Sequence, residues 1–90
     1  MNGQYRIEIL PSAEREIADL PKKARAQIVR RINNLSSVPR PRGCKPLRAA
    51  DGLYRIRSGD YRVVYRVEDT RLVVLVVRVG IRRDIYRRLP

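Results

Sequence analysis

The stretch from Leu53 to Val79 constrains the fold most, because apolar and charged residues alternate along it in segments joined by very short turns. Period-two alternation is the pattern of a strand with one buried face. The predicted strands and turns are, in order, Leu53–Arg57, Ser58-Gly59-Asp60, Tyr61–Glu68, Asp69-Thr70 and Leu72–Val79, with Gly80 ending the last strand. Connections this short require antiparallel neighbours, so the sequence predicts a three-stranded meander.

The same alternation assigns side chains to the two faces of the sheet. The arginines of the first two strands fall on one face, and the intervening tyrosines and valines turn toward the helices. The arginines are Arg55, Arg57, Arg62 and Arg66. The segment Leu72–Val79 is apolar on both faces, which favours a central position. We expect its second face to be covered either by the C-terminal segment or by a partner protein.

The first half of the chain predicts a strand followed by helices. A short period-two pattern, Tyr5–Ile9, ends at Pro11, after which Ser12 is a candidate helix N-cap. An apolar stripe with helical spacing then runs through Ile17, Leu20, Ala24, Ile28, Ile32 and Leu35. Because the stripe crosses Pro21, the pattern predicts either two antiparallel helices or one helix bent at that proline.

Residues 36–52 contain three prolines and two glycines without a clear period, and we expect a loop there. The order of elements predicts an α+β fold with an N-terminal strand, a helical hairpin and the antiparallel meander. The helices should pack on one face of the sheet. A chain of 90 residues is expected to form a single domain, residues 1–90.

The balance of charges indicates a polyanionic partner. The chain carries 21 basic and 9 acidic residues, a net charge of +12, and Lys22, Lys23 and Lys45 are the only lysines. The other basic residues are arginines, which pair bidentately with phosphate and stack on bases, so nucleic acid is the simplest partner. The basic residues of the loop, including Lys45 and Arg48, form either a flap against the phosphate backbone or a solvated connector. Their spacing leaves both interpretations open.

The residue types that are missing exclude most hydrolases. The chain has no histidine and a single cysteine, Cys44, which excludes Ser-His-Asp and Cys-His mechanisms, paired-histidine ribonuclease chemistry and zinc sites. We therefore expect neither a metal nor another cofactor. The N-terminus lacks the apolar segment of a signal peptide, and the run Leu72–Val77 is too short to cross a membrane, so we expect a cytoplasmic protein without membrane contact.

One reaction still suits a site built from arginine and tyrosine. RNA contains its own nucleophile, the 2′-hydroxyl, which attacks the adjacent phosphate when it is held in line. Arginines stabilise the charge that develops on the phosphate oxygens, and a phenol among cations has its pKa lowered toward a useful range. Tyr86 is the candidate phenol. The residues by themselves favour nucleic-acid binding over catalysis.

The segments LYRIRSGDYRVVYRV and VVLVVRVGIRRDIYRRL resemble the RelE/ParE superfamily of bacterial toxins from type II toxin–antitoxin modules. The resemblance covers essentially the whole chain and is closer to the RelE-type ribosome-dependent mRNA endonucleases than to the ParE gyrase poisons. It implies a toxin that inhibits translation by cleaving message in the ribosomal A site through the 2′-hydroxyl. The alternatives are a ParE-like gyrase inhibitor without nuclease activity and a non-catalytic basic binder.

The resemblance also implies residue roles and partners. Arg62 and Arg82 would hold the scissile phosphate, and Tyr86 would orient the nucleotide and take part in proton transfer. Arg55 and Arg57, which stand where the best-known members have lysines, would contact RNA and stabilise charge. The expected protein partner is an acidic RelB-like antitoxin whose extended helix wraps the toxin in a hetero-oligomer. Further contacts, with the message or with the 16S rRNA of the A site, are expected from Lys45, Arg48, Arg66 and Arg83.

Overall fold

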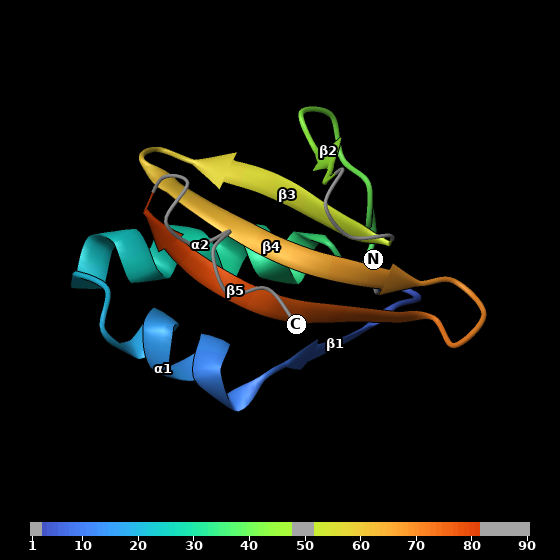
Figure 1. The fold of residues 1–90 in the computed structure, drawn as a ribbon, viewed down its shortest axis with the longest axis horizontal. Helices are drawn as coiled ribbons and strands as arrows, with labels where there is room; N and C mark the ends of the chain where they lie inside the picture. Colours follow the sequence, from blue (N-terminus) through green and yellow to red (C-terminus); the bar gives the residue numbers. More distant parts are fainter. Residues whose placement is uncertain (1–2, 48–51, 82–90) are drawn as a thin grey trace.

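The computed structural model describes residues 3–47 and 52–81, which form a five-stranded sheet with two helices on one face (Figure 1). The helices are α1 (Pro11–Ala18) and α2 (Lys22–Asn34). The strands are β1 (Arg6–Ile9), β2 (Lys45–Pro46), β3 (Leu53–Ser58), β4 (Tyr61–Glu68) and β5 (Val73–Ile81). Their spatial order is β1-β5-β4-β3-β2, with β1 parallel to β5 and every other pair antiparallel. The predicted α+β fold is confirmed.

Two tight turns produce the meander of β3, β4 and β5. Gly59, between β3 and β4, has a φ of 60°, a left-handed conformation that glycine adopts without a side-chain clash. Leu72, between β4 and β5, has a φ of 54°, which is uncommon for a leucine. Its carbonyl accepts a 2.8 Å hydrogen bond from the Arg6 N–H, so the first strand helps to hold this turn in place.

The last strand is longer at its C-terminal end than predicted. The structure corrects the expected range Leu72–Val79, because Leu72 belongs to the turn and the strand continues through Gly80 to Ile81. Gly80 pairs with Arg62 and Ile81 pairs with Tyr61, so hydrogen bonds to β4 keep the chain extended where glycine alone would end it. A β-bulge between these strands leaves Val77 as an extra residue on β5.

The helix boundaries also differ from the sequence expectation. Ser12 is not the N-cap of α1, because the helix begins at Pro11 and Leu10 is the capping residue. The Leu10 N–H donates to the Val76 carbonyl at 3.0 Å, so the chain stays paired with β5 up to the residue before the helix. Pro11 suits the first helical position because its φ is already fixed there. Pro21 caps α2, and the predicted apolar stripe therefore belongs to two separate helices.

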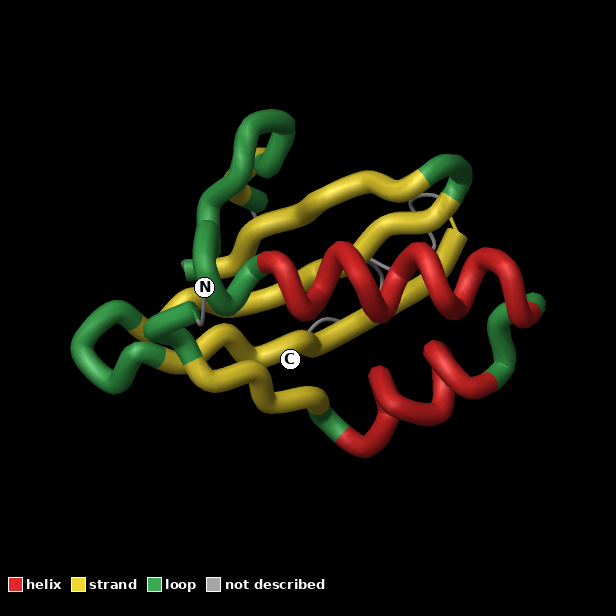
Figure 2. The backbone as a smooth tube through the Cα atoms, turned by 180° about the vertical axis from the view of Figure 1, so that it is seen from behind, coloured by secondary structure: helices red, strands yellow, loops and turns green. Residues whose placement is uncertain are grey.

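The main hydrophobic core lies between the helices and the sheet (Figure 2). The helical part of this core agrees with the predicted stripe, since Ile17, Ile28, Ile32 and Leu35 are buried, and Leu20 is partly buried against it. The strands supply the opposite side of the core from Ile56, Val63, Tyr65, Val67, Val74, Val76 and Val79. The tyrosines and valines that alternate with the arginines of β3 and β4 thus face the helices as expected, whereas Val64 shares the face of the arginines.

A second, smaller apolar cluster lies on the face of the sheet that the helices leave open. Leu53, Val64 and Val77 are all buried there, and Leu10, Leu47 and Leu75 pack against them. This cluster confirms that the central strand β5 is apolar on both faces. The loop predicted for residues 36–52 also contains an unpredicted edge strand, β2, which pairs with Tyr54 and Arg55 of β3.

Candidate functional site

The open face of the sheet carries a group of basic side chains that we call the basic face. Its described members are Lys45, Arg55, Arg57, Arg62 and Arg66. Residues directly opposite each other in an antiparallel pair point to the same side of the sheet. Arg57 is opposite Arg62, and Arg55 is opposite both Lys45 and Val64, so the register confirms the predicted shared face.

A hollow of about 250 Å³ lies at the β3–β4 turn, and we call it the turn hollow. Its lining residues come from the ends of β3, β4 and β5 and from the turn itself: Arg57, Gly59, Asp60, Tyr61, Arg62 and Ile81. Two of the predicted site residues, Arg57 and Arg62, therefore meet at one concave surface. The residues that sequence reasoning missed are Asp60, Tyr61 and Ile81. Asp60 and Tyr61 could have been identified because they lie between the two arginines in sequence. Ile81 could have been identified by its place at the end of the last strand.

The electrostatics of the basic face favour an external anion. Like charges directly opposite each other in a sheet destabilise it, and this face contains two such pairs, Arg57–Arg62 and Lys45–Arg55. Among the residues described, none of these four cations forms an ion pair with a carboxylate. A phosphate placed between two guanidinium groups would accept charge-assisted hydrogen bonds from both and remove their repulsion.

An apolar patch separates the basic side chains. Val64, which is fully buried, lies opposite Arg55 and two residues along the strand from both Arg62 and Arg66. Leu53 and Val77 extend this patch as part of the smaller cluster. Apolar surface lowers the local dielectric constant, so each guanidinium beside it interacts more strongly with a bound anion than it would in bulk water.

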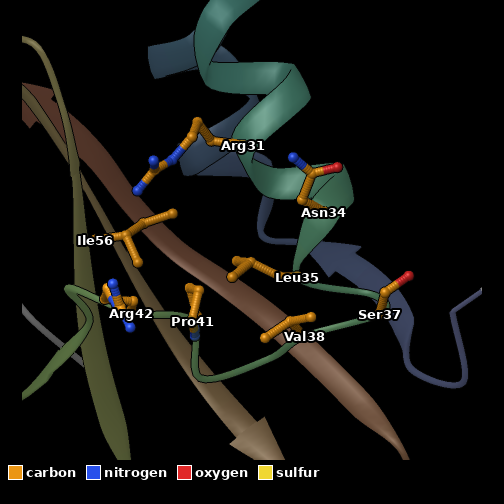
Figure 3. Close-up of a pocket in the computed structure, with 8 residues that line it drawn as sticks. All are labelled: Arg31, Asn34, Leu35, Ser37, Val38, Pro41, Arg42 and Ile56. Atoms are coloured by element: carbon orange, nitrogen blue, oxygen red, sulfur yellow. The ribbon is translucent and has the colours of Figure 1, made fainter.

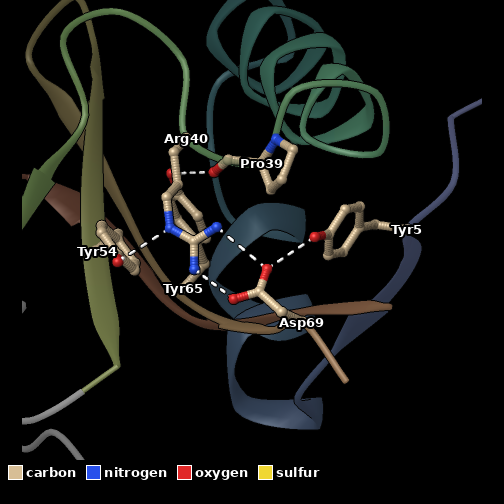
Figure 4. Close-up of polar contacts among 6 residues, drawn as sticks. All are labelled: Tyr5, Pro39, Arg40, Tyr54, Tyr65 and Asp69. Atoms are coloured by element: carbon tan, nitrogen blue, oxygen red, sulfur yellow. Dashed lines mark hydrogen bonds and ion pairs between the residues drawn. The ribbon is translucent and has the colours of Figure 1, made fainter. Parts of the chain in front are cut away.

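At the opposite end of the sheet, an arginine is paired with a carboxylate (Figure 4). Arg40 donates two hydrogen bonds to the Asp69 carboxylate, at 3.1 and 2.8 Å, and one to the Tyr54 hydroxyl at 3.0 Å. Tyr5 also donates to Asp69, at 2.7 Å. The Arg40 hydrogen bond, followed by that of Tyr5, holds the pKa of the Asp69 carboxyl below its usual value. Arg40, one of the basic residues of the loop, therefore forms intramolecular contacts that stabilise the fold.

The same network has a buried neighbour that anchors the loop after α2. The Tyr65 hydroxyl donates to the Pro39 carbonyl at 2.7 Å, and burial raises the pKa of this phenol. The pKa of Tyr5 is raised by its hydrogen bond to Asp69. Both phenols therefore stay protonated at neutral pH and act as hydrogen-bond donors. The loop that carries Pro39 is thus fixed to β4 and to the β4–β5 turn.

Glu16 of α1 holds the end of β5 from the helix side. The first strand ends at Ile9, so the edge of β5 beyond that point has no strand partner from β1. Glu16 takes the place of a strand partner there. One of its carboxylate oxygens accepts a hydrogen bond from the Val79 N–H at 2.8 Å, and the other accepts one from the Arg78 Nε–H at 3.0 Å. The last residue of β5, Ile81, lines the turn hollow, so this carboxylate fixes the strand that forms one wall.

Four of the predicted site residues lie outside the described part of the chain: Arg48, Arg82, Arg83 and Tyr86. Arg82 is the next residue in sequence after Ile81. The roles implied for all four remain predictions. Within residues 3–47 and 52–81, no three His, Cys, Asp or Glu side chains are grouped closely enough to hold a metal ion. Neither α1 nor α2 is long and apolar enough to cross a membrane.

Comparison with known proteins identifies the relatives of this chain. Residues 7–86 match the protein family described as the ParE toxin of the type II toxin–antitoxin system parDE. Toxin RelG from Mycobacterium tuberculosis is 37% identical over 86 residues, which cover 93% of this chain and 98% of that protein.

Two solved structures have the same fold. In the toxin–antitoxin complex RelBE2 from Mycobacterium tuberculosis, the matching chain is 32% identical with a TM-score of 0.77, and the match covers 89% of this chain and 93% of that one. In the intact E. coli RelBE toxin–antitoxin complex, the matching chain is 31% identical with a TM-score of 0.75, covering 87% of this chain and 96% of that one.

Proposed function

This chain belongs to the RelE/ParE superfamily of toxins from type II toxin–antitoxin systems, and we propose that it is a RelE-type endonuclease that cleaves mRNA in the ribosomal A site. One observation carries the proposal. Arg57 and Arg62 face each other across β3 and β4, line one hollow, and form no ion pair within the described part of the chain. Such a pair suits the phosphate between two nucleotides.

The proposed reaction uses the nucleophile that RNA provides. The 2′-oxygen attacks the adjacent phosphorus in line, the bond from phosphorus to the 5′-oxygen breaks, and the products are a 2′,3′-cyclic phosphate and a 5′-hydroxyl end. The 2′-hydroxyl proton leaves to an acceptor, and the departing 5′-oxygen takes up a proton. Arg57 and Arg62 would stabilise the negative charge that grows on the phosphate oxygens, and one well-placed donor commonly accelerates such reactions by about 10²–10³-fold.

The remaining predicted residues complete this proposal. Arg82 would hold the scissile phosphate and assist the leaving oxygen, and Tyr86 would orient the nucleotide and take part in proton transfer. Arg55 would stabilise charge next to the turn hollow. The outer contacts, with message or 16S rRNA, would come from Lys45, Arg48, Arg66 and Arg83. The reaction needs no metal ligand from the protein, because guanidinium groups supply the positive charge.

We also propose an acidic antitoxin as the protein partner, in a hetero-oligomer that holds the toxin inactive. The solved relatives named above are complexes between a toxin and its antitoxin. An acidic partner is also the electrostatic complement of a chain with a net charge of +12. Action on ribosomes implies that the active toxin works in the cytoplasm.

The direct test uses ribosomes programmed with a defined message. The purified chain should produce discrete cuts in the A-site codon, detected by mapping 5′ ends. Those ends should carry hydroxyl groups, so an adaptor should ligate to them only after treatment with a polynucleotide kinase. A message with a single 2′-deoxynucleotide at the cut position should resist cleavage there. Uncut message with the wild-type chain would overturn the nuclease proposal.

One observation favours a second candidate, a ParE-like inhibitor of DNA gyrase that cleaves nothing. The family match over residues 7–86 is to the ParE toxins. The same preparation should therefore be incubated with gyrase and supercoiled DNA. Gyrase-dependent DNA breaks together with intact message would establish this alternative, whereas A-site cuts without DNA breaks would exclude it.

A further inference from the structure

A second cavity, of about 360 Å³, lies on the helix side of the sheet, away from the basic face (Figure 3). It is bounded by the C-terminal end of α2, the loop that follows it, and β3. Its residues are Arg31, Asn34, Leu35, Ser37, Val38, Pro41, Arg42 and Ile56. We call it the α2–β3 cavity. Ile56 and Arg57 are neighbours on β3 and point to opposite faces, so this cavity and the turn hollow are separate sites.

The centre of the α2–β3 cavity is apolar. Figure 3 shows the side chains of Leu35, Val38, Pro41 and Ile56 turned toward one another. Leu35 and Ile56 belong to the buried core, but Val38 is 53% exposed. The cavity therefore opens the main core to solvent at one point, and a valine stands exposed beside it. Exposed apolar surface next to a concave, apolar opening is typical of a protein-binding site.

The rim of the cavity is basic. Arg31 and Arg42 both line it, and among the residues described neither forms an ion pair. In Figure 3 the Arg31 guanidinium extends from α2 toward Ile56, while Arg42 approaches from the loop. Asn34 and Ser37 add neutral hydrogen-bonding groups. The combination selects a ligand with an apolar group for the centre and negative charges for the rim.

The loop that forms one wall of the cavity is held in a fixed position. Tyr65 donates to the Pro39 carbonyl, and Arg40 is paired with Asp69, so the middle of this wall, between Val38 and Pro41, is anchored to β4 and the β4–β5 turn. A cavity with fixed walls loses little conformational entropy when it is filled, which favours tight binding.

We propose that the α2–β3 cavity is an anchor point for the antitoxin, and that it receives one large aliphatic or aromatic side chain from an acidic antitoxin segment. The charge complementarity of an acidic segment with Arg31 and Arg42 selects this occupant. The inference rests on the proposed partner but not on the proposed nuclease activity. Because the cavity and the basic face lie on opposite sides of the sheet, the antitoxin can be attached here while another part of it blocks the arginines.

Two exposed valines give a matched test of the anchor. Val38→Glu places a negative charge at the cavity mouth, and Val29→Glu places the same charge on α2 at a valine that is 39% exposed and does not line the cavity. The probe is the purified antitoxin of the same module, titrated into each folded toxin by calorimetry. Val38→Glu should weaken binding at least tenfold, and Val29→Glu should change it less than threefold. Arg42→Ala should also weaken binding, which provides a second variant if Val38→Glu does not fold.

The possible failures are distinguishable. Equal affinity of the wild-type, Val38→Glu and Arg42→Ala proteins for the antitoxin would overturn the anchor while leaving the antitoxin partner in place. No binding of antitoxin to the wild-type chain would overturn the proposed partner and the anchor together. If the toxin alone sediments as a dimer that Val38→Glu dissociates, the cavity holds a second copy of the chain and the proposal is wrong. Cleavage of programmed ribosomes by Val38→Glu without antitoxin should match the wild type.

Discussion

The two ends of the sheet use arginine in opposite ways. At the β4–β5 end, Arg6 pairs with Glu8, Arg40 with Asp69 and Arg71 with Glu68. At the β3–β4 end, Arg57 faces Arg62, and neither forms an ion pair within the described part of the chain, although Asp60 also lines the turn hollow. The first arrangement satisfies each guanidinium from within the protein. The second leaves both guanidinium groups without an ion pair among the described residues, and so available for an external anion.

The difference matters because the two arrangements have different energetic consequences. Exposed ion pairs contribute little to stability individually, but they neutralise charge and hold loops in position. Two like charges facing each other lower stability, so the β3–β4 end loses some free energy of folding, which the proposed phosphate binding would explain. The β4–β5 end should therefore influence mainly stability, and the β3–β4 end mainly activity.

The largest expected effect comes from deleting an arginine at the β3–β4 end. Arg62→Ala should reduce the rate of message cleavage on programmed ribosomes by about 10²–10³-fold, because one donor to the phosphate transition state is lost. Its melting temperature should stay close to that of the wild type. An active Arg62→Ala protein would show that the turn hollow is not the site of cleavage. A large drop in melting temperature would mean that Arg62 is structural.

The second prediction concerns the Glu16 carboxylate, which holds the end of β5 next to the turn hollow. Glu16→Ala should lower the free energy of unfolding by about 1–3 kcal/mol, because the partly buried Val79 N–H and Arg78 lose their acceptor. Glu16→Gln keeps an oxygen for the Val79 N–H and should recover much of that loss. Urea denaturation measures both. If the two substitutions are equally harmful, the charge interaction with Arg78 matters more than the strand edge.

At the β4–β5 end the effect should be on stability and should depend on pH. Asp69→Asn should lower the melting temperature by a few degrees at pH 7 and leave cleavage unchanged, because the carboxylate holds Arg40 and Tyr5. The folded-state pKa of Asp69 lies below its unfolded value of about 4, so its stabilisation is present above that pH and is lost as the pH falls through the lowered pKa. Thermal melts at several pH values should show the wild-type and variant curves converging in acid.

The smallest expected effect on stability has the opposite sign, because this substitution should stabilise the protein. Arg57→Gln removes the repulsion between Arg57 and Arg62, so it should raise the free energy of unfolding by about 0.2–1 kcal/mol while lowering the cleavage rate. The midpoint of urea denaturation should rise with an unchanged m-value. A destabilised Arg57→Gln protein would show that the two guanidinium groups support each other or a neighbour in the folded chain.

Local sequence patterns were sufficient to predict the antiparallel meander and the basic face. Period-two alternation and short turns allow essentially one arrangement of β3, β4 and β5, and Arg55, Arg57, Arg62 and Arg66 therefore share a face as predicted. Where the prediction was wrong, a distant hydrogen-bond partner decided the outcome. Gly80 stays in β5 because β4 pairs with it, although glycine commonly ends a strand.

Contacts between distant residues explain most of what the sequence did not predict. Glu16 lies 63 residues before Val79, and Arg40 lies 29 residues before Asp69. No periodicity relates such pairs, and only the packed fold brings them together. The same holds for the α2–β3 cavity, whose residues come from α2, a loop and β3. The roles of Arg82 and Tyr86, which lie outside the described residues, stay predictions.

The central claim is that the unpaired arginines at the β3–β4 end of the sheet bind phosphate and that the ion-paired arginines at the β4–β5 end do not. Its most direct test is the salt dependence of binding to programmed ribosomes for Arg62→Ala and Arg71→Ala, which each remove one positive charge from opposite ends. Loss of one phosphate contact lowers the magnitude of the slope of log K against log salt concentration by about 0.7–0.9. Arg62→Ala should show this change and Arg71→Ala should keep the wild-type slope. Equal slopes for the two variants would contradict the claim.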